Sequence, residues 1–228
     1  MRFFVLNSGG ADSTTALAMV IERFGHDAVE TVSVYYGQKH RKELDCARAI
    51  ADYYDVPHST IDLSEVYKNL KNPLTGDGDV PPEPYDAQTD GVHPVATYIP
   101  FRNGLFLSAV TAFALSRCED NVIIVLGNHA DDIAGYAYPD CGEDFVYAMT
   151  EAVIAGSGGR AKLWCPFTEY YKKDIIAEGL RLGVPYQLTW SCYNGGEKAC
   201  GVCGTCRDRQ KAFHENGAED PLEYEVRL

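Results

Sequence analysis

A pair of glycines followed by hydroxyl and carboxylate residues stands close to the start of the chain. The segment Ser8-Gly9-Gly10-Ala11-Asp12-Ser13-Thr14-Thr15 comes directly after the apolar run Phe3-Phe4-Val5-Leu6 and Asn7. Adjacent glycines allow positive φ and a close approach of the backbone to a ligand, and the first amides of a following helix attract anions. The pattern therefore indicates a loop that binds phosphate or pyrophosphate between a strand and a helix. The same residues also fit an ordinary strand-to-helix turn with a capping Ser or Asp.

Four cysteines near the other end of the sequence have the spacing of metal ligands. They are Cys192, Cys200, Cys203 and Cys206, in the pattern Cys-x7-Cys-x2-Cys-x2-Cys, and the other four of the eight cysteines are scattered. Each Cys-x2-Cys step lets two thiolates face one ion, and four thiolates close a tetrahedron, which predicts structural zinc rather than a catalytic site with an open position. An iron–sulfur cluster, a disulfide pair and a zinc ribbon that binds nucleic acid are the alternatives for this spacing.

The charge balance favours a small substrate over a nucleic acid. The chain of 228 residues has 33 acidic and 20 basic residues, a formal net charge of −13. Nucleic-acid binding depends on clusters of Lys and Arg, so we expect no nucleic-acid partner. No apolar run reaches the roughly 20 residues that span a bilayer, and the N-terminal residues lead into the glycine loop rather than into a secretory signal. Together with the scattered thiols, these features predict a cytoplasmic protein with no membrane partner.

Apolar periodicity places both sets of residues on an alternating series of strands and helices. After the first strand and loop, strand-like runs lie at 31–36, 58–62, 121–126 and 161–165. Helical patterns lie at 15–24, from after residue 41 to about residue 54, and at 102–117, 143–155 and 172–182. Such alternation is typical of a parallel α/β sheet covered on both faces, with ligands beyond the carboxyl ends of the strands. Residues 121–126 are predicted to form an inner strand because they are apolar on both faces, and 161–165 an exposed or edge strand.

The periodicity is interrupted by a long segment that is rich in proline and glycine. From about 66 to 98 the sequence contains Pro73, Pro81, Pro82, Pro84 and Pro94. A loop of this length in a compact domain is usually a functional lid or an irregular connection, and we expect a lid over the active site. The chain is therefore predicted to consist of an α/β nucleotide-binding domain at 1–186, which includes this lid-like loop, and a zinc-binding region at 187–228 packed on it.

The glycine loop and the four cysteines together resemble one known family. The motif Ser-Gly-Gly-x-Asp-Ser at 8–13 is similar to the pyrophosphate loop (PP-loop) of the N-type ATP pyrophosphatases, and its pairing with the cysteine pattern resembles the 7-cyano-7-deazaguanine synthase (QueC) family. The resemblance continues through Tyr36-Gly37-Gln38-x-His40-Arg41, Pro100-x-Arg102-Asn103, Tyr138-Pro139-Asp140-Cys141, Lys172 and Thr189-Trp190-Ser191-Cys192-Tyr193. It implies an adenine nucleotide alpha hydrolase-like (Rossmann-like) fold.

The resemblance also implies a reaction. Enzymes of this family convert 7-carboxy-7-deazaguanine and ammonia to 7-cyano-7-deazaguanine, for queuosine-type bases, through acyl-adenylate and amide intermediates. ATP, Zn²⁺ and Mg²⁺ are the implied cofactors, and a homodimer is the implied assembly. Phe101, in place of a glycine, and the stretch 127–137 depart from the family pattern, which leaves open a ligase that stops at 7-amido-7-deazaguanine. A PP-loop enzyme that modifies tRNA is the second alternative, which the net charge of −13 disfavours.

The glycine loop supplies the implied nucleotide-binding residues. By resemblance they are Asn7, Ser8, Gly9, Gly10, Ala11, Asp12, Ser13, Thr14, Thr15, Ala16 and Leu17. The amides of Gly9 and Gly10 would hold the leaving pyrophosphate, and Asp12 would either cap the helix or help to hold magnesium. Arg102 and Lys172 are the implied partners for phosphate or adenylate charge. The alternative for both is a solvated surface position.

The remaining candidates lie in the segment after residue 126. His129 and Asp131 are candidate general bases toward ammonium or the amide, although a histidine that follows a strand is more often a hydrogen-bonded loop residue. The implied substrate-binding residues are Tyr138, Asp140, Phe145 and Arg102. Asp140 would accept hydrogen bonds from a guanine-like edge, and Tyr138 or Phe145 would stack on the base. An aspartate in an ordinary turn is the alternative for Asp140.

Overall fold

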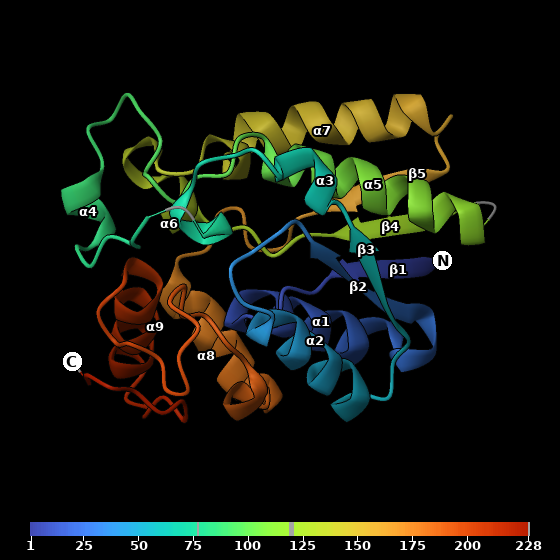
Figure 1. The fold of residues 1–228 in the computed structure, drawn as a ribbon. Coiled ribbons are helices and arrows are strands. Elements are labelled where there is room, and N and C mark those ends of the chain that lie inside the picture. Colours follow the sequence, from blue (N-terminus) through green and yellow to red (C-terminus); the bar gives the residue numbers. More distant parts are fainter. Residues whose placement is uncertain (77, 119–120, 228) are drawn as a thin grey trace.

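Five parallel strands form one sheet in the order β3-β2-β1-β4-β5 (Figure 1). The strands are β1 (Arg2–Leu6), β2 (Val29–Tyr35), β3 (His58–Asp62), β4 (Val122–Val125) and β5 (Ala161–Trp164). The computed structural model describes residues 1–76, 78–118 and 121–227, and none of the helices within them combines the length and apolar composition needed to cross a membrane. The parallel α/β fold is confirmed, with β4 inside the sheet and β5 at its edge as predicted.

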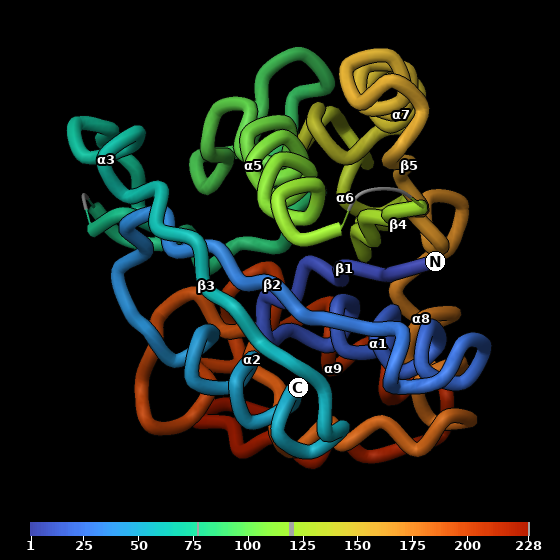
Figure 2. The backbone as a smooth tube through the Cα atoms, turned by 90° about the vertical axis from the view of Figure 1, so that its right-hand side faces the viewer, coloured from blue at the N-terminus to red at the C-terminus, as the bar shows by residue number. Residues whose placement is uncertain are grey.

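Helices cover both faces of this sheet. Figures 1 and 2 show α1 (Ala11–Phe24), α2 (Lys42–Tyr53) and α8 (Lys172–Leu182) on one face, and α5 (Arg102–Arg117) and α7 (Glu143–Gly156) on the other. Successive side chains of a strand point to opposite faces, so β1 supplies both cores. Phe3 and Val5 pack in the core between the sheet and α1, and Phe4 and Leu6 pack in the core between the sheet and α5. This two-sided burial explains why β1 reads as a continuous apolar run.

The segment between β3 and α5 is packed rather than extended. It contains α3 (Ser64–Tyr67), the 3-10 turn η2 (Pro73–Thr75) and α4 (Tyr85–Gln88). The Asn72 side-chain amide donates to the carbonyl oxygens of Ala96 and Tyr98 at 3.0 and 2.9 Å, and Leu74 and Ile99 are buried. These contacts tie the two halves of the predicted lid-like loop together. Its action as a lid stays a prediction.

Short turns complete the connection from β4 to α7 and the approach to the C-terminal region. They are α6 (Ala130–Ile133) and the 3-10 turns η3 (Ala134–Tyr136), η4 (Pro139–Cys141) and η5 (Tyr186–Leu188). A further 3-10 turn, η1 (His26–Ala28), connects α1 to β2. The observed bounds differ from the predicted ones by a few residues, and the largest difference is at α1, which begins at Ala11 instead of Thr15. Asp12 and Ser13, which the sequence offered as capping residues, therefore lie inside the first turn of this helix, and Gly10 occupies the N-cap position.

A helix that the sequence pattern did not predict, α9 (Gly204–Glu215), packs on α8 in the C-terminal region. Its Arg209 is fully buried and donates from Nε and Nη2 to the two carboxylate oxygens of Asp220, at 2.7 and 3.0 Å. The same guanidinium donates to the Thr189 hydroxyl and the Tyr186 carbonyl oxygen. This one side chain therefore joins α9, the C-terminal tail and the segment that leads into the cysteines.

Removal of one partner of this buried pair should destabilise the whole molecule. Asp220→Ala leaves the Arg209 charge buried without its carboxylate, and we expect a loss of about 3–5 kcal/mol in the free energy of unfolding. Urea denaturation measures it. The control is Glu215→Ala, which removes an exposed 4.0 Å ion pair with Lys211 on the same helix and should cost less than about 0.5 kcal/mol. Equal losses in the two variants would contradict the expectation.

Candidate active site

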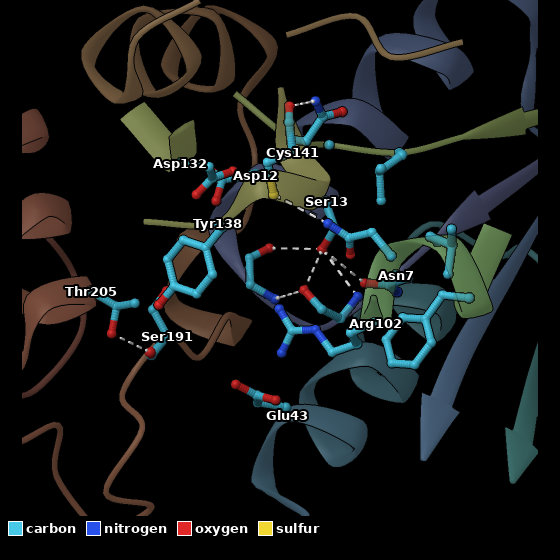
Figure 3. A pocket seen from close by; sticks show the side chains of 18 of the residues that line it. Asn7, Asp12, Ser13, Glu43, Arg102, Asp132, Tyr138, Cys141, Ser191 and Thr205 are labelled. Atoms are coloured by element: carbon cyan, nitrogen blue, oxygen red, sulfur yellow. Dashed lines mark hydrogen bonds between the residues drawn. The ribbon is translucent and has the colours of Figure 1, made fainter. Parts of the chain in front are cut away.

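A cavity lies at the carboxyl ends of β1, β2 and β4, where ligands bind to sheets of this type (Figure 3). The glycine loop, the start of α2, the start of α5 and the segment after β4 supply most of its wall. The C-terminal region closes one side. Predicted site residues in its lining are Asn7, Ser8, Gly10, Asp12, Ser13, Arg102, His129, Tyr138 and Lys172. The fold thus brings together residues that are far apart in the sequence.

The glycine loop lies tightly against α2. Gly9 has φ +79°, and a Cβ atom there would overlap the backbone carbonyl of Glu43, so only glycine fits. The Asn7 side-chain amide donates to the Ala47 carbonyl oxygen at 3.0 Å, and its oxygen accepts the Gly9 N–H at 3.0 Å. Since the first-turn amides of a helix have no intrahelical partners, the amino end of α1 at the cavity wall is suited to hold an anion.

Asp12 and Lys172 form an ion pair beside the loop. Lys172 Nζ lies 2.5 Å from Asp12 Oδ2, and His129 Nε2 lies 3.7 Å from the same oxygen. Burial alone would raise the pKa of Asp12, but Lys172 and His129 outweigh it and hold this pKa below its usual value. The other carboxylate oxygen, Oδ1, is buried without a hydrogen-bond partner among the described residues. It is therefore a free hard-oxygen ligand of the kind that Mg²⁺ prefers.

The two candidate general bases have different positions. His129 caps α6, lines the cavity and lies with Nε2 3.6 Å from Asp132 Oδ1. Asp131 lies outside the residues that line this cavity and borders a neighbouring groove. Its Oδ2 accepts the backbone N–H of Lys172 at 2.7 Å. The structure thus gives Asp131 a role in holding the start of α8, and its catalytic role stays a prediction.

Two oppositely charged side chains face each other in the cavity. Arg102, at the start of α5, extends toward Glu43 of α2, and Figure 3 shows the two groups separated by open space. Arg102 Nη1 donates to the Tyr36 hydroxyl at 3.4 Å, and its guanidinium lies 5.4 Å from the centre of the Tyr36 ring. Burial raises the pKa of the Glu43 carboxyl to about 7, although Arg102 acts in the opposite direction.

Three tyrosine hydroxyls meet on another side of the cavity. Tyr138 donates to Tyr85 at 3.1 Å, Tyr85 donates to Tyr193 at 3.3 Å, and the hydroxyls of Tyr138 and Tyr193 are 3.4 Å apart. Tyr85 comes from the predicted lid-like loop, Tyr138 from the segment after β4 and Tyr193 from the cysteine region. All three line the cavity. These contacts place part of the loop at the cavity wall.

Asp140 and Phe145 do not line the cavity. Asp140 Oδ2 accepts the backbone N–H of Asn103 at 2.8 Å, and the Asn103 side chain donates to the Asp140 carbonyl oxygen at 2.9 Å. Asp140 therefore binds the start of α5, the element that carries Arg102. The Phe145 ring packs edge-on against Phe101 at 6.1 Å. Direct contact of these two residues with a base stays a prediction, and their observed contacts are structural.

The four predicted metal ligands are brought together. The sulfur atoms of Cys192, Cys200, Cys203 and Cys206 all lie within 4.8 Å of one another. A tetrahedral zinc site with Zn–S bonds of about 2.3 Å needs sulfurs about 3.8 Å apart, so the cluster fits one such ion with small adjustments. The N–H groups of Cys200 and Cys203 donate to the sulfurs of Cys192 and Cys200, at 3.3 and 3.4 Å. Such donors stabilise thiolates.

The cysteine cluster is linked to the glycine loop through Trp190. The Trp190 backbone N–H donates to the Gly9 carbonyl oxygen at 2.8 Å, and its indole N–H donates to the Cys192 carbonyl oxygen at 2.8 Å. The Lys42 ammonium lies 3.5 Å from the centre of the indole ring and donates to two carbonyls of the cysteine loop. The cysteine region therefore packs against the cavity wall and is not a separate appendage.

Several cavity residues were missed by sequence reasoning. They are Tyr36, Glu43, Tyr85, Asn103, Asn128, Tyr193, Thr205 and Asp208. Tyr36, Asn103 and Tyr193 lie within the motifs quoted for the resemblance, which was a usable signal. Glu43 is a polar position on an amphipathic helix, and Asp208 lies on the unpredicted α9. Burial raises the pKa of Asp208 to about 6, against the opposing effect of Lys172.

The fold and the loop define a class of protein, an α/β protein with a PP-loop-like segment at the first strand-to-helix junction. A solved structure of NMN synthetase from Francisella tularensis matches the fold with a TM-score of 0.50 at 16% identity, covering 96% of this chain and 78% of that chain. That likeness supports the fold alone.

Sequence comparison identifies the family. A family model described as Queuosine biosynthesis protein QueC matches residues 2–217. A 7-cyano-7-deazaguanine synthase from Caldicellulosiruptor saccharolyticus is 41% identical over 228 residues, which cover 100% of this chain and 97% of that protein. A protein of the same name from Thermoplasma acidophilum is 43% identical over 227 residues, with 97% and 91% covered. The chain belongs to the QueC family, and the resemblance seen in its motifs is confirmed.

The Glu43 carboxyl should make the stability of the free protein depend on pH. Its pKa rises from the ordinary 4.5 to about 7 on folding, so the neutral form is favoured in the folded state. The contribution of neutral Glu43 to the free energy of unfolding is therefore fully present below pH 4.5, and it is lost as the pH rises through 7. Glu43→Gln removes this loss, and the variant should exceed the wild type by up to about 3 kcal/mol in free energy of unfolding at pH 8.

Urea denaturation at pH 4.5 and pH 8 measures the effect. At pH 4.5 the Glu43→Gln variant and the wild type should have equal stability. Asp45→Asn is the matched control, because Asp45 lies on the same helix and is exposed. A Glu43→Gln variant that is less stable than the wild type at both pH values would contradict the expectation.

Proposed function

We propose that this chain is a synthase that converts 7-carboxy-7-deazaguanine and ammonia to 7-cyano-7-deazaguanine, with ATP split into AMP and pyrophosphate. The observation that carries the proposal is the similarity, over essentially the full chain, to proteins named 7-cyano-7-deazaguanine synthase. The cavity supports it because a loop suited to anions lies beside an aromatic and charged space. Queuosine-type base biosynthesis is then the context of the reaction.

The chemistry requires two activations. In the first, a carboxylate oxygen of the substrate attacks the α-phosphorus of ATP, pyrophosphate leaves, and ammonia displaces AMP from the acyl-adenylate to give the amide. In the second, the amide oxygen attacks another ATP, and loss of AMP and a proton leaves the nitrile. Each round consumes one ATP and releases one AMP and one pyrophosphate. The protein needs to orient the reactants and stabilise negative charge on phosphate oxygens.

The residues beside the glycine loop are suited to the phosphate part of this task. The first-turn amides of α1, with Ser8 and Ser13, would hold the leaving pyrophosphate. Lys172 would offset its charge. Asp12 holds the Lys172 ammonium in the free protein, and its unpartnered Oδ1 would be a ligand for Mg²⁺, which supplies charge neutralisation on the phosphates when bound. His129, in the same cluster, remains the candidate to accept a proton from ammonium or the amide.

The two predicted parts of the chain are proposed to act as one unit. Residues 1–186 would bind the nucleotide, the lid-like loop at about 66–98 would close over the substrate, and residues 187–228 would hold zinc. Packing of α9 on α8 and the Trp190–Gly9 hydrogen bond join the two parts and support their action as one unit. A homodimer and a cytoplasmic location also remain proposals, and light scattering on the purified protein tests the first.

Product analysis tests the function. The protein is incubated with 7-carboxy-7-deazaguanine, ammonia and excess ATP, and the products are measured by mass spectrometry and by AMP release. The nitrile is lighter than the amide by one water. Amide that persists with ATP in excess would favour the ligase that stops at 7-amido-7-deazaguanine. If neither product forms and the protein instead shifts tRNA in a gel, the tRNA-modifying alternative is favoured.

Lys172→Ala should abolish most of this activity. Loss of a cation beside the leaving pyrophosphate costs about 100-fold or more in the rate of AMP formation. The control is the neighbouring Lys173→Ala, because Lys173 is exposed and has no place in the cavity lining. AMP formation by the Lys172→Ala variant at the wild-type rate would remove Lys172 from the phosphate site.

We also propose that the cysteine cluster binds one structural zinc. Elemental analysis of purified protein should find about one zinc per chain, and Cys203→Ser should lose the metal and lower the melting temperature, because metal binding contributes folding free energy. Cys118→Ser, outside the cluster, is the control and should retain the metal. Iron together with visible absorption would instead indicate an iron–sulfur cluster.

A further inference from the structure

One carboxylate in the cavity has no partner in the protein that explains its position. Glu43 makes no hydrogen bond and no ion pair of 4.0 Å or less in the part of the chain that the structure describes, although Arg102 faces it. Burial raises the pKa of this carboxyl to about 7, although Arg102 acts in the opposite direction. Glu43 is half-buried, and a carboxylate partly withdrawn from water without donors costs stability unless a ligand supplies them.

The three other carboxylates that line the cavity belong to the part beside the glycine loop and Lys172, where the phosphates are proposed to bind. Asp12 is paired with Lys172, and Asp132 accepts the backbone N–H of His129 at 3.1 Å. Burial raises the pKa of Asp208 and the nearby Lys172 lowers it, which places Asp208 in the same part of the cavity as Lys172. Asp140, predicted to read the base, binds the start of α5 instead. Glu43 is therefore the carboxylate that remains for recognition beside Arg102.

Aromatic side chains lie beside Arg102 in the cavity that Glu43 also lines. The ring of Tyr36 lies 5.7 Å from the ring of Phe106, and both line the cavity with Trp190 and Tyr193. Flat bases stack on aromatic rings and on guanidinium planes. The space next to Glu43 is thus suited to a planar heterocycle, with charged groups available at its edge.

A guanine-type edge has a pattern that this pair complements. Its O6 atom accepts a hydrogen bond, and the adjacent N1–H and 2-amino groups donate. Arg102 carries only donors, and an ionised Glu43 carries only acceptors that can take two parallel N–H groups. An arginine and a glutamate that face each other without contact leave room for such an edge between them.

We propose that Arg102 and Glu43 together read the acceptor–donor–donor edge of the deazaguanine base, with Arg102 donating to O6 and Glu43 accepting from N1–H and the 2-amino group. This inference rests on the proposed function for the identity of the base. It assigns Glu43 as a specificity-determining residue. Glu43, rather than Asp140, is then the carboxylate that recognises the base. Asp140 then acts as a positioning residue that holds the start of α5.

Binding measurements with two ligands test the assignment without turnover. Calorimetry at pH 8, where Glu43 is ionised, compares 7-carboxy-7-deazaguanine with its analogue that lacks the 2-amino group, in the absence of ATP. The wild type should bind the parent compound about 10- to 100-fold more tightly, because a hydrogen bond to a charged group is lost in the analogue. Glu43→Gln should reduce this ratio to about threefold or less, since its amide has one acceptor oxygen.

Asp45→Asn, on the solvent side of the same helix, should keep the wild-type ratio. A Glu43→Gln variant that retains the full ratio would overturn the inference. So would a variant that keeps the ratio and loses product formation, because that result assigns Glu43 to proton transfer. Failure of the proposed function is a different result: the wild type discriminates between the two ligands but forms neither amide nor nitrile with ATP and ammonia.

Discussion

The backbone of the glycine loop is held between α2 and the C-terminal region, and the binding properties of the cavity depend on this restraint. A Cβ atom at Gly9 would overlap α2, Asn7 ties the loop to Ala47, and the Gly9 carbonyl oxygen accepts the Trp190 N–H. A loop fixed on two sides can present its free amides without reorganising when an anion arrives, and such preorganisation is what makes backbone donors effective.

The C-terminal region maintains one side of that restraint through buried polar contacts. Arg209 joins α9 to Asp220 and to the segment that contains Thr189, and Thr205 Oγ1 donates to the Ser191 carbonyl oxygen. Residues 189–192 contact the buried Arg209, the Gly9 carbonyl oxygen and the cysteine cluster. A change in the ion pair or in the cluster would therefore alter the support of the glycine loop.

Sequence patterns were sufficient for the elements whose burial is two-sided and for the chemistry that depends on local spacing. The apolar run of β4 predicted an inner parallel strand, that of β1 predicted a strand before the glycine loop, and the cysteine spacing predicted a cluster that the fold assembles. Helix α9 was missed because two of its buried positions, Arg209 and Gln210, are polar in sequence and interrupt the apolar pattern of Cys206, Ala212 and Phe213. Asp140 and Glu43 show the corresponding limit for sites, since which carboxylate faces the cavity depends on how α2 and α5 pack, and no local pattern encodes that packing.

The charged groups of the cavity illustrate a cost that folding alone does not explain. The Asp12 Oδ1 atom lacks a partner, and Glu43 and Asp208 have raised pKa values because burial opposes their ionisation. A core selected only for stability would neutralise or solvate such groups, because each one reduces a free energy of folding that is only about 5–15 kcal/mol in total. Their concentration at the carboxyl end of the sheet is therefore best explained by ligands that supply the missing partners: cations and donor groups for the carboxylates, and phosphate oxygens for the amides of α1.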